Sequence, residues 1–205
     1  IPTINFVKQC TLVQSLTRAG YNTFLCGSTG TSKTVVVNTI FQRALNTQIV
    51  DNEEQATYQL ESDQLNINTQ ELPFSAQTKA EYVENAIFEK LDKKRKNAYY
   101  PAANRGAHYI FIDDADMPNL DRFGTQLPNE LLRQLLIQSG CYDRQKLTFK
   151  QVNNIQMIIA SQQPGAGRNV MNTRFTSKFV EIAAHELSKD ALITIFGTLM
   201  QGFLS

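Results

Sequence analysis

The fold is decided by the stretch Gly27-Ser28-Thr29-Gly30-Thr31-Ser32-Lys33-Thr34. It nearly matches the phosphate-binding pattern G-x-x-x-x-G-K-[ST], and it lies between an apolar run at 23–26 and a helical pattern. In such a loop, glycines let successive backbone N–H groups converge on phosphate oxygens, and the following helix adds the positive end of its dipole. An ordinary Gly/Ser turn is the alternative, but the strand, the helix and the Lys-Thr pair together favour a phosphate site.

Individual residues of this loop have separate expected roles. Lys33 reaches the terminal phosphates as a point charge, and Thr34 supplies a hydroxyl to Mg²⁺, which needs few protein ligands. Ser32 departs from the pattern, which has glycine there, and a left-handed serine costs about 1–2 kcal/mol. The nucleotide is therefore expected to contact Gly27, Ser28, Thr29, Gly30, Thr31, Ser32, Lys33, Thr34 and Val35.

A second motif is an apolar strand at 108–112 that ends in two carboxylates, Asp113 and Asp114. Asp113 is expected to hold the Mg²⁺ shell together with Thr34. Asp114 occupies the position of the residue that activates the attacking water, but it is one methylene shorter than glutamate. A displacement of about 1 Å can cost about 100-fold in rate, so hydrolysis is in doubt. The alternative is an acidic turn that caps a helix, which the order of the two motifs disfavours.

The wider pattern alternates apolar runs with helical stripes. The runs lie at 23–26, 72–75, 108–112, 155–160 and 179–182, and the stripes at 35–45, 82–91 and 127–136. Three runs are almost continuously apolar, as in parallel strands buried on both faces. The sequence therefore predicts an α/β fold with a mainly parallel five-stranded sheet flanked by helices. The strands near Phe24 and Ile112 are expected to be close neighbours, since Lys33 and Asp113 must share one site.

Two segments are harder to interpret. Residues 46–71 are rich in Asn, Gln, Thr and Glu, and we interpret them as a polar insertion that includes a hairpin. The basic run at 93–96 is predicted to end a helix, where cations suit the helix dipole. A solvated helix end is the preferred interpretation, and a binding patch is the alternative.

Composition excludes several classes of protein. The 205 residues are 42% hydrophobic and 19% charged, a globular balance. The net charge of +1 lacks the basic surplus of a nucleic-acid binder, and no apolar run approaches the ~18 residues of a membrane span. The three cysteines favour neither a disulfide framework nor a zinc site, and a reducing compartment fits them better. Since the chain starts without Met and stops within a helical pattern, we expect a fragment of a longer protein.

The segments around these motifs indicate a family. Those that carry the resemblance lie at 74–78, 90–96, 111–118, 123–134, 141–144, 163–169 and 173–175. Together they resemble the third AAA+ module of a dynein heavy chain, and the axonemal type more than the cytoplasmic. The resemblance runs from Ile1 to about Gly197. Its most specific part is the pattern Phe-Gly-x-Gln-x-Pro-x-Glu-Leu-Leu-Arg-Gln at 123–134.

The resemblance implies a function. Dynein carries six AAA+ modules in a ring, and its third module binds ATP or ADP, with Mg²⁺, and regulates the motor. Residues 1–205 would form the large α/β subdomain, with the helical lid absent. The implied partners are neighbouring modules, other dynein chains and, through the rest of the motor, the microtubule, with no nucleic acid and no membrane. The implied location is the cytoplasm and cytoskeleton, in a ciliary or flagellar axoneme.

The resemblance also assigns residues outside the loop. Gln162 stands where AAA+ modules often place a sensor asparagine, and Ser177 stands where the family often has a second arginine. Arg174 is implied to act in trans, as an arginine finger in the neighbouring module's site. A structural arginine that satisfies helix carbonyls is the alternative for Arg174, and Arg168 has the same ambiguity with weaker support. Glu130 and Arg133 are expected on a solvated or module-contacting helix face.

Three hypotheses therefore stand at this point. The chain is a regulatory module that binds ATP or ADP, a catalytically active AAA+ ATPase module, or a degenerate structural spacer that binds nothing. The departures at Ser32, Asp114 and Gln162 leave binding plausible and put hydrolysis in doubt.

Overall fold

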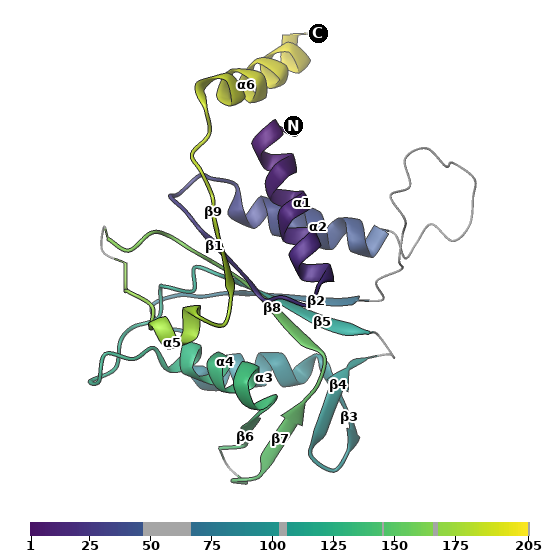
Figure 1. Cartoon of the computed structure of the whole chain (residues 1–205), viewed down its shortest axis with the longest axis vertical. Helices are drawn as coiled ribbons and strands as arrows, with labels where there is room; N and C mark the ends of the chain where they lie inside the picture. Colours follow the sequence, from purple (N-terminus) through teal and green to yellow (C-terminus); the bar gives the residue numbers. More distant parts are fainter. Residues whose placement is uncertain (47–66, 103–105, 145, 166–167, 205) are drawn as a thin grey trace, which may run out of the picture.

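The computed structural model describes residues 1–46, 67–102, 106–144, 146–165 and 168–204 (Figure 1). Its helices are α1 (Ile4–Arg18), α2 (Lys33–Asn46), α3 (Ala80–Glu89), α4 (Leu127–Gln138), α5 (Thr173–Thr176) and α6 (Lys189–Leu204). Its strands are β1 (Thr23–Cys26), β2 (Ile67–Pro73), β3 (Leu91–Arg95), β4 (Ala98–Pro101), β5 (Ala107–Asp113), β6 (Gly140–Tyr142), β7 (Phe149–Val152), β8 (Ile155–Ser161) and β9 (Val180–Ala183).

The main sheet has five strands in the order β2-β5-β8-β1-β9, and every pair in it is parallel. This confirms the predicted α/β fold with a five-stranded sheet. The strands that contain Phe24 and Ile112 are not direct neighbours, because β8 lies between them. Parallel strands still bring their carboxyl ends to one edge, so the loops after β1, β5 and β8 meet there.

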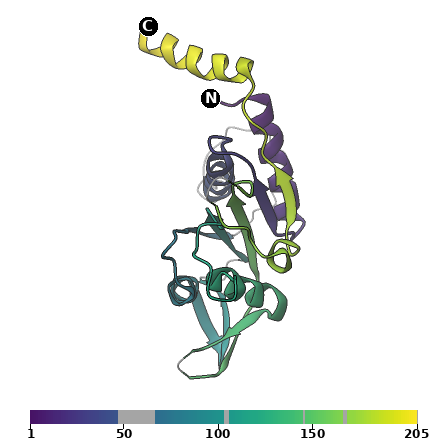
Figure 2. The ribbon, with the colours of Figure 1, turned by 90° about the vertical axis from the view of Figure 1, so that its left-hand side faces the viewer.

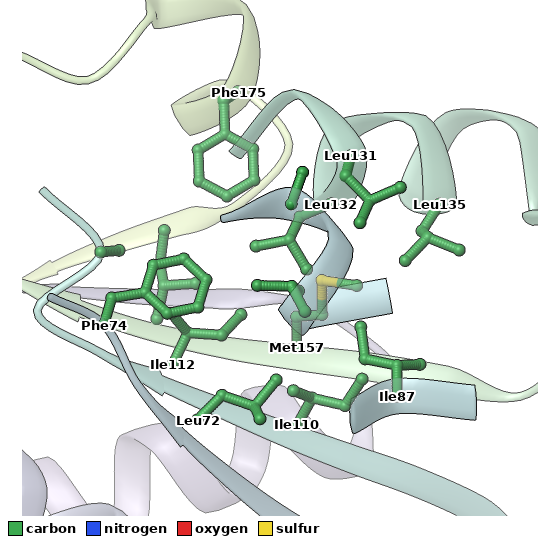
Figure 3. Packing of buried hydrophobic residues seen from close by; sticks show 14 of the residues in the cluster. Leu72, Phe74, Ile87, Ile110, Ile112, Leu131, Leu132, Leu135, Met157 and Phe175 are labelled. Carbon is green, nitrogen blue, oxygen red and sulfur yellow. The ribbon is translucent and has the colours of Figure 1, made fainter. Parts of the chain in front are cut away.

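Both faces of this sheet are covered by helices, which gives two hydrophobic layers (Figures 1 and 2). Alternate residues of each strand enter opposite layers, as the period of two requires. Ile110 and Ile112 of β5 face the layer of α3 and α4, whereas Phe111 packs with α1 and α2. Figure 3 shows the first layer, with the labelled residues Leu72, Phe74, Ile87, Ile110, Ile112, Leu131, Leu132, Leu135, Met157 and Phe175.

A second sheet, β3-β4-β7-β6, was not predicted. The prediction that the basic run at 93–96 ends a helix is wrong, because α3 stops at Glu89 and the run lies on strand β3 and its turn. Leu91, assigned to the helical stripe, is the buried first residue of that strand. Its antiparallel partner β4 follows after Asn97, whose φ of 64° closes the turn.

The structure tests the predicted insertion at 46–71 only at its ends. Residues 47–66 lie outside the described residues, so the hairpin proposed there is not tested. Residues 67–71, counted as part of the insertion, instead begin strand β2, which runs to Pro73. The predicted strand at 72–75 therefore begins five residues too late, because Gln70 and Glu71 hide its start from a search for apolar runs.

Helix α6 has no buried residue and extends from the body of the fold (Figure 2). Its exposed side chains include Phe196, Met200 and Phe203. Within the described part of the chain, no helix is both long and apolar enough to cross a membrane.

His108 is buried where β2, β5 and α3 meet. Its Nε2 lies 3.0 Å from Gln70 Oε1, and Gln70 Nε2 donates to Ala86 O at 2.7 Å, so the imidazole donates and Gln70 accepts. Its Nδ1 has no hydrogen-bond partner among the described residues. Burial, with a smaller contribution from Lys90, lowers the pKa of His108 from 6.5 to about 4.

We therefore expect acid to destabilise the chain through His108. The unfolded chain takes up a proton near pH 6.5 and the folded chain only near pH 4, so stability is lost as pH falls through this window. The loss amounts to at most about 3 kcal/mol, at 1.36 kcal/mol per pKa unit. Urea unfolding at pH 7, 6, 5 and 4.5 measures it. The variant His108→Gln should show a flatter pH profile, and an unchanged profile would contradict the assignment.

Candidate functional site

The loop at 27–32 links the carboxyl end of β1 to the start of α2, as the pattern predicts. Gly27 packs against Ala184, the residue that follows β9. A Cβ at position 27 would lie 2.4 Å from Ala184 O. Only glycine fits at this approach. Gly30 has a φ of 82° with open space around it, and Ser32 has a φ of 65°. The left-handed serine expected from the sequence is therefore observed.

Lys33 points back into its own loop. Its Nζ donates to Gly27 O and Ser28 O, both at 2.8 Å, and to Thr31 Oγ1 at 3.3 Å. Burial lowers the pKa of Lys33, and the carboxylates of Asp113 and Asp114 partly offset that effect. The ammonium is thus held over the loop, at the place where a phosphate would bind.

The phosphate loop and the acidic strand end meet at the carboxyl edge of the sheet. Thr34 Oγ1 donates to Asp113 Oδ2 at 2.7 Å, and the backbone N–H of Asp114 donates to Asp113 Oδ1 at 3.1 Å. A hydroxyl and a carboxylate are hard oxygen ligands that suit Mg²⁺, which keeps several waters and takes phosphate oxygens. The described residues contain no group of three or more His, Cys, Asp or Glu that could hold a metal.

Asp114 is half-exposed, and its φ of 53° is left-handed. Its Oδ1 lies 3.4 Å from Arg168 Nη1, so the expected catalytic carboxylate is ion-paired. Sequence reasoning gave Arg168 only weak support as a finger and overlooked Asp116, whose Oδ1 lies 3.6 Å from the same nitrogen. Burial raises the pKa of Asp116, and the Arg168 guanidinium counteracts this.

The remaining expected contacts surround the loop. Gln162 is half-buried and directly follows β8, next to β1, since Cys26 Sγ lies 3.9 Å from Gln162 O. Thr29 and Val35 are exposed. Ser28 Oγ donates to Glu186 Oε1 at 3.2 Å, which brings the segment after β9 to the loop.

The loop after Asp114 is held by amide side chains from the most specific block of the sequence. Gln126 Nε2 donates to Asp116 O at 3.1 Å and to Pro118 O at 2.9 Å. Asn129 Nδ2 donates to Ala115 O at 2.9 Å. These contacts explain the Gln and Asn of that block as supports for the acidic loop. Glu130 and Arg133 form an ion pair of 2.8 Å on the same helix.

Arg174 lies on the short helix α5, at the edge of the sheet where β9 runs. Asn172 Oδ1 accepts from the Arg174 backbone N–H at 2.9 Å, and the adjacent Phe175 is fully buried against Phe179. The Arg174 side chain is exposed, and it forms no ion pair with any residue that the structure describes. The Arg174 side chain is therefore solvent-exposed, while its backbone is held in place by these contacts.

The sheet, the phosphate loop and the acidic strand define this chain as a P-loop protein with an AAA fold. A family model described as "P-loop containing dynein motor region" matches residues 1–187. The chain belongs to this family.

Its relatives include axonemal dynein heavy chains. It is 34% identical over 205 residues to "Dynein axonemal heavy chain 6" of Homo sapiens. The aligned region covers 100% of this chain and 4% of that protein. It is 37% identical over 131 residues to "Dynein axonemal heavy chain 12" of Rattus norvegicus, or 64% of this chain and 4% of that protein. The chain thus spans about 4% of the length of these relatives.

Ser32 leads to a prediction about stability. Ser32→Gly should raise the free energy of unfolding by about 0.5–1 kcal/mol, because relief of the left-handed strain exceeds the added entropy of the unfolded chain. Urea unfolding of both proteins measures the change. Ser32→Ala keeps the Cβ and should give no gain. A glycine variant no more stable than the alanine variant would show that Ser32 is unstrained.

Proposed function

We propose that this chain is a nucleotide-binding AAA module of an axonemal dynein heavy chain, and that it takes ATP or ADP with Mg²⁺. The main observation behind this proposal is the hydrogen bond of 2.7 Å from Thr34 Oγ1 to Asp113 Oδ2, beside the Lys33 ammonium. Gly27, Ser28, Thr29, Gly30, Thr31, Ser32 and Val35 would surround the phosphates, with Gln162 beside them. Thr34 and Asp113 would hold Mg²⁺, which would offset the negative charge of the phosphates.

We further infer that this is the third module of the ring and that its role is regulatory. The resemblance of 123–134, 163–169 and 173–175 to that module supports this assignment. Residues 1–205 would form its large α/β subdomain, with an insertion before β2. Neighbouring modules and other dynein chains are its proposed partners, and the whole motor would act on microtubules in a ciliary or flagellar axoneme.

Hydrolysis at this site is expected to be slow. Asp114 is one methylene shorter than the usual glutamate, and its carboxylate is already in contact with Arg168, so it is poorly placed to reach an attacking water. Bound nucleotide would then act as a regulatory ligand.

Calorimetry tests the proposal. Titration of the chain with ADP and with ATP, each with Mg²⁺, should show one weak site per chain. Turnover should be negligible beside the ~1–10³ s⁻¹ of ordinary enzymes. No heat with either nucleotide would mean a structural spacer, and rapid turnover would mean an active ATPase.

A further inference from the structure

Arg168 lies between two acidic side chains on the loop after β5. Its Nη1 is 3.4 Å from Asp114 Oδ1 and 3.6 Å from Asp116 Oδ1. Only 20% of the Arg168 side chain is exposed, against 46% of Asp114 and 2% of Asp116. One guanidinium thus joins a carboxylate at the nucleotide site to a carboxylate in the interior.

Asp116 is an anchor for this arginine. Neither of its carboxylate oxygens has a hydrogen-bond partner in the part of the chain that the structure describes. A buried carboxylate is costly, and the Arg168 guanidinium 3.6 Å away offsets part of that cost. Asp116 therefore restrains the guanidinium where it can contact Asp114.

The backbone on both sides of the contact is also fixed. Asn169 Nδ2 donates to Pro118 O at 2.9 Å, and the Arg168 N–H donates to Gly165 O at 3.1 Å. The segment after β8 is thus tied to the loop after β5. These contacts hold the backbone that carries the Arg168 side chain.

We propose that Arg168, anchored by Asp116, is a positioning residue that orients the Asp114 carboxylate and neutralises its charge beside the metal site. This inference rests on the proposed nucleotide site at Lys33, Thr34 and Asp113. It gives Arg168 a role in its own module. Without this arginine, a free carboxylate next to Asp113 repels the nucleotide and attracts Mg²⁺.

Nucleotide binding tests the proposal through its dependence on metal. The quantity to be measured is the ratio of the Kd for ATP in EDTA to the Kd for ATP with Mg²⁺. Arg168→Gln should raise this ratio about three- to tenfold, as expected for one unpaired charge within several ångströms of the phosphates. Arg168→Lys, which keeps a cation, should stay near the original ratio. Addition of Asp114→Asn to Arg168→Gln should restore it, because the unpaired charge is removed.

The matched control is Arg133→Gln, an arginine of similar exposure that pairs with Glu130 away from the site. It should leave the ratio unchanged. If Arg168→Gln leaves the ratio unchanged, or if Asp114→Asn does not reverse its effect, Arg168 has a structural role only and the proposal is wrong.

Unfolding of the nucleotide-free chain provides a second measurement. The shift in urea midpoint caused by Arg168→Gln should be smaller in the Asp114→Asn background and in the Asp116→Asn background. Additive shifts with Asp114→Asn would overturn the proposal. If no variant and not even the original chain binds ATP, the nucleotide function fails, while this cycle still decides whether Arg168 and Asp114 are coupled.

Discussion

Lys33→Ala should weaken binding of ATP and ADP on the order of 10³-fold with almost no loss of fold. The Lys33 ammonium lies over the phosphate loop, where it would make two or more charge-assisted hydrogen bonds to phosphate. Such bonds contribute about 1.5–3 kcal/mol each, and every 1.4 kcal/mol is a factor of ten. Calorimetric titration with Mg²⁺-nucleotide measures the loss.

The fold should tolerate this change because Lys33 is only half-buried and its hydrogen-bond partners all lie in its own loop. Its removal leaves no cavity in either hydrophobic layer, so unfolding in urea should change by less than about 0.5 kcal/mol. Lys93→Ala, at an exposed lysine on β3, should change neither quantity. A Lys33 variant that unfolds, or one that still binds ATP normally, would contradict the assignment.

The central part of the fold could be predicted because its signals are local. A parallel strand that is buried on both faces has a continuous apolar sequence. The sequences around Phe24, Ile112 and Ile158 contain such runs. The phosphate loop and Asp113 follow these runs directly, so their positions at the same sheet edge could be inferred. Even the left-handed conformation of Ser32 could be inferred from the pattern.

The second sheet could not be predicted because its strands are short and β3 is exposed after its first residue. Only the first residue of β3 is buried, and its basic residues fit a helix end equally well. The pairing of β4 with β7 joins residues that are about fifty positions apart, and no local pattern encodes it. The contact of Arg168 with Asp114 and Asp116 has the same origin, since it forms only when the loops after β5 and β8 meet.

Arg174→Ala should slow ATP hydrolysis in the preceding module by a factor on the order of 10³, and leave nucleotide affinity at Lys33 unchanged. The side chain is exposed on α5, and Asn172 and Phe175 hold its backbone in place. A guanidinium is suited to bidentate phosphate contact, and fingers of this kind contribute 10³–10⁵ in related P-loop enzymes. The measurement needs a protein that contains both modules, with each phosphate loop inactivated in turn.

The isolated chain separates this role from a structural one. Since the Arg174 guanidinium has no ion-pair partner among the described residues, its loss should change the free energy of unfolding by less than about 0.5 kcal/mol. Lys178→Ala removes a nearby exposed cation and should leave hydrolysis in the preceding module unchanged. If Arg174→Ala instead weakens binding at Lys33, or costs the isolated chain more than about 1–2 kcal/mol as a lost buried hydrogen bond would, then Arg174 stabilises its own module and the assignment in trans fails.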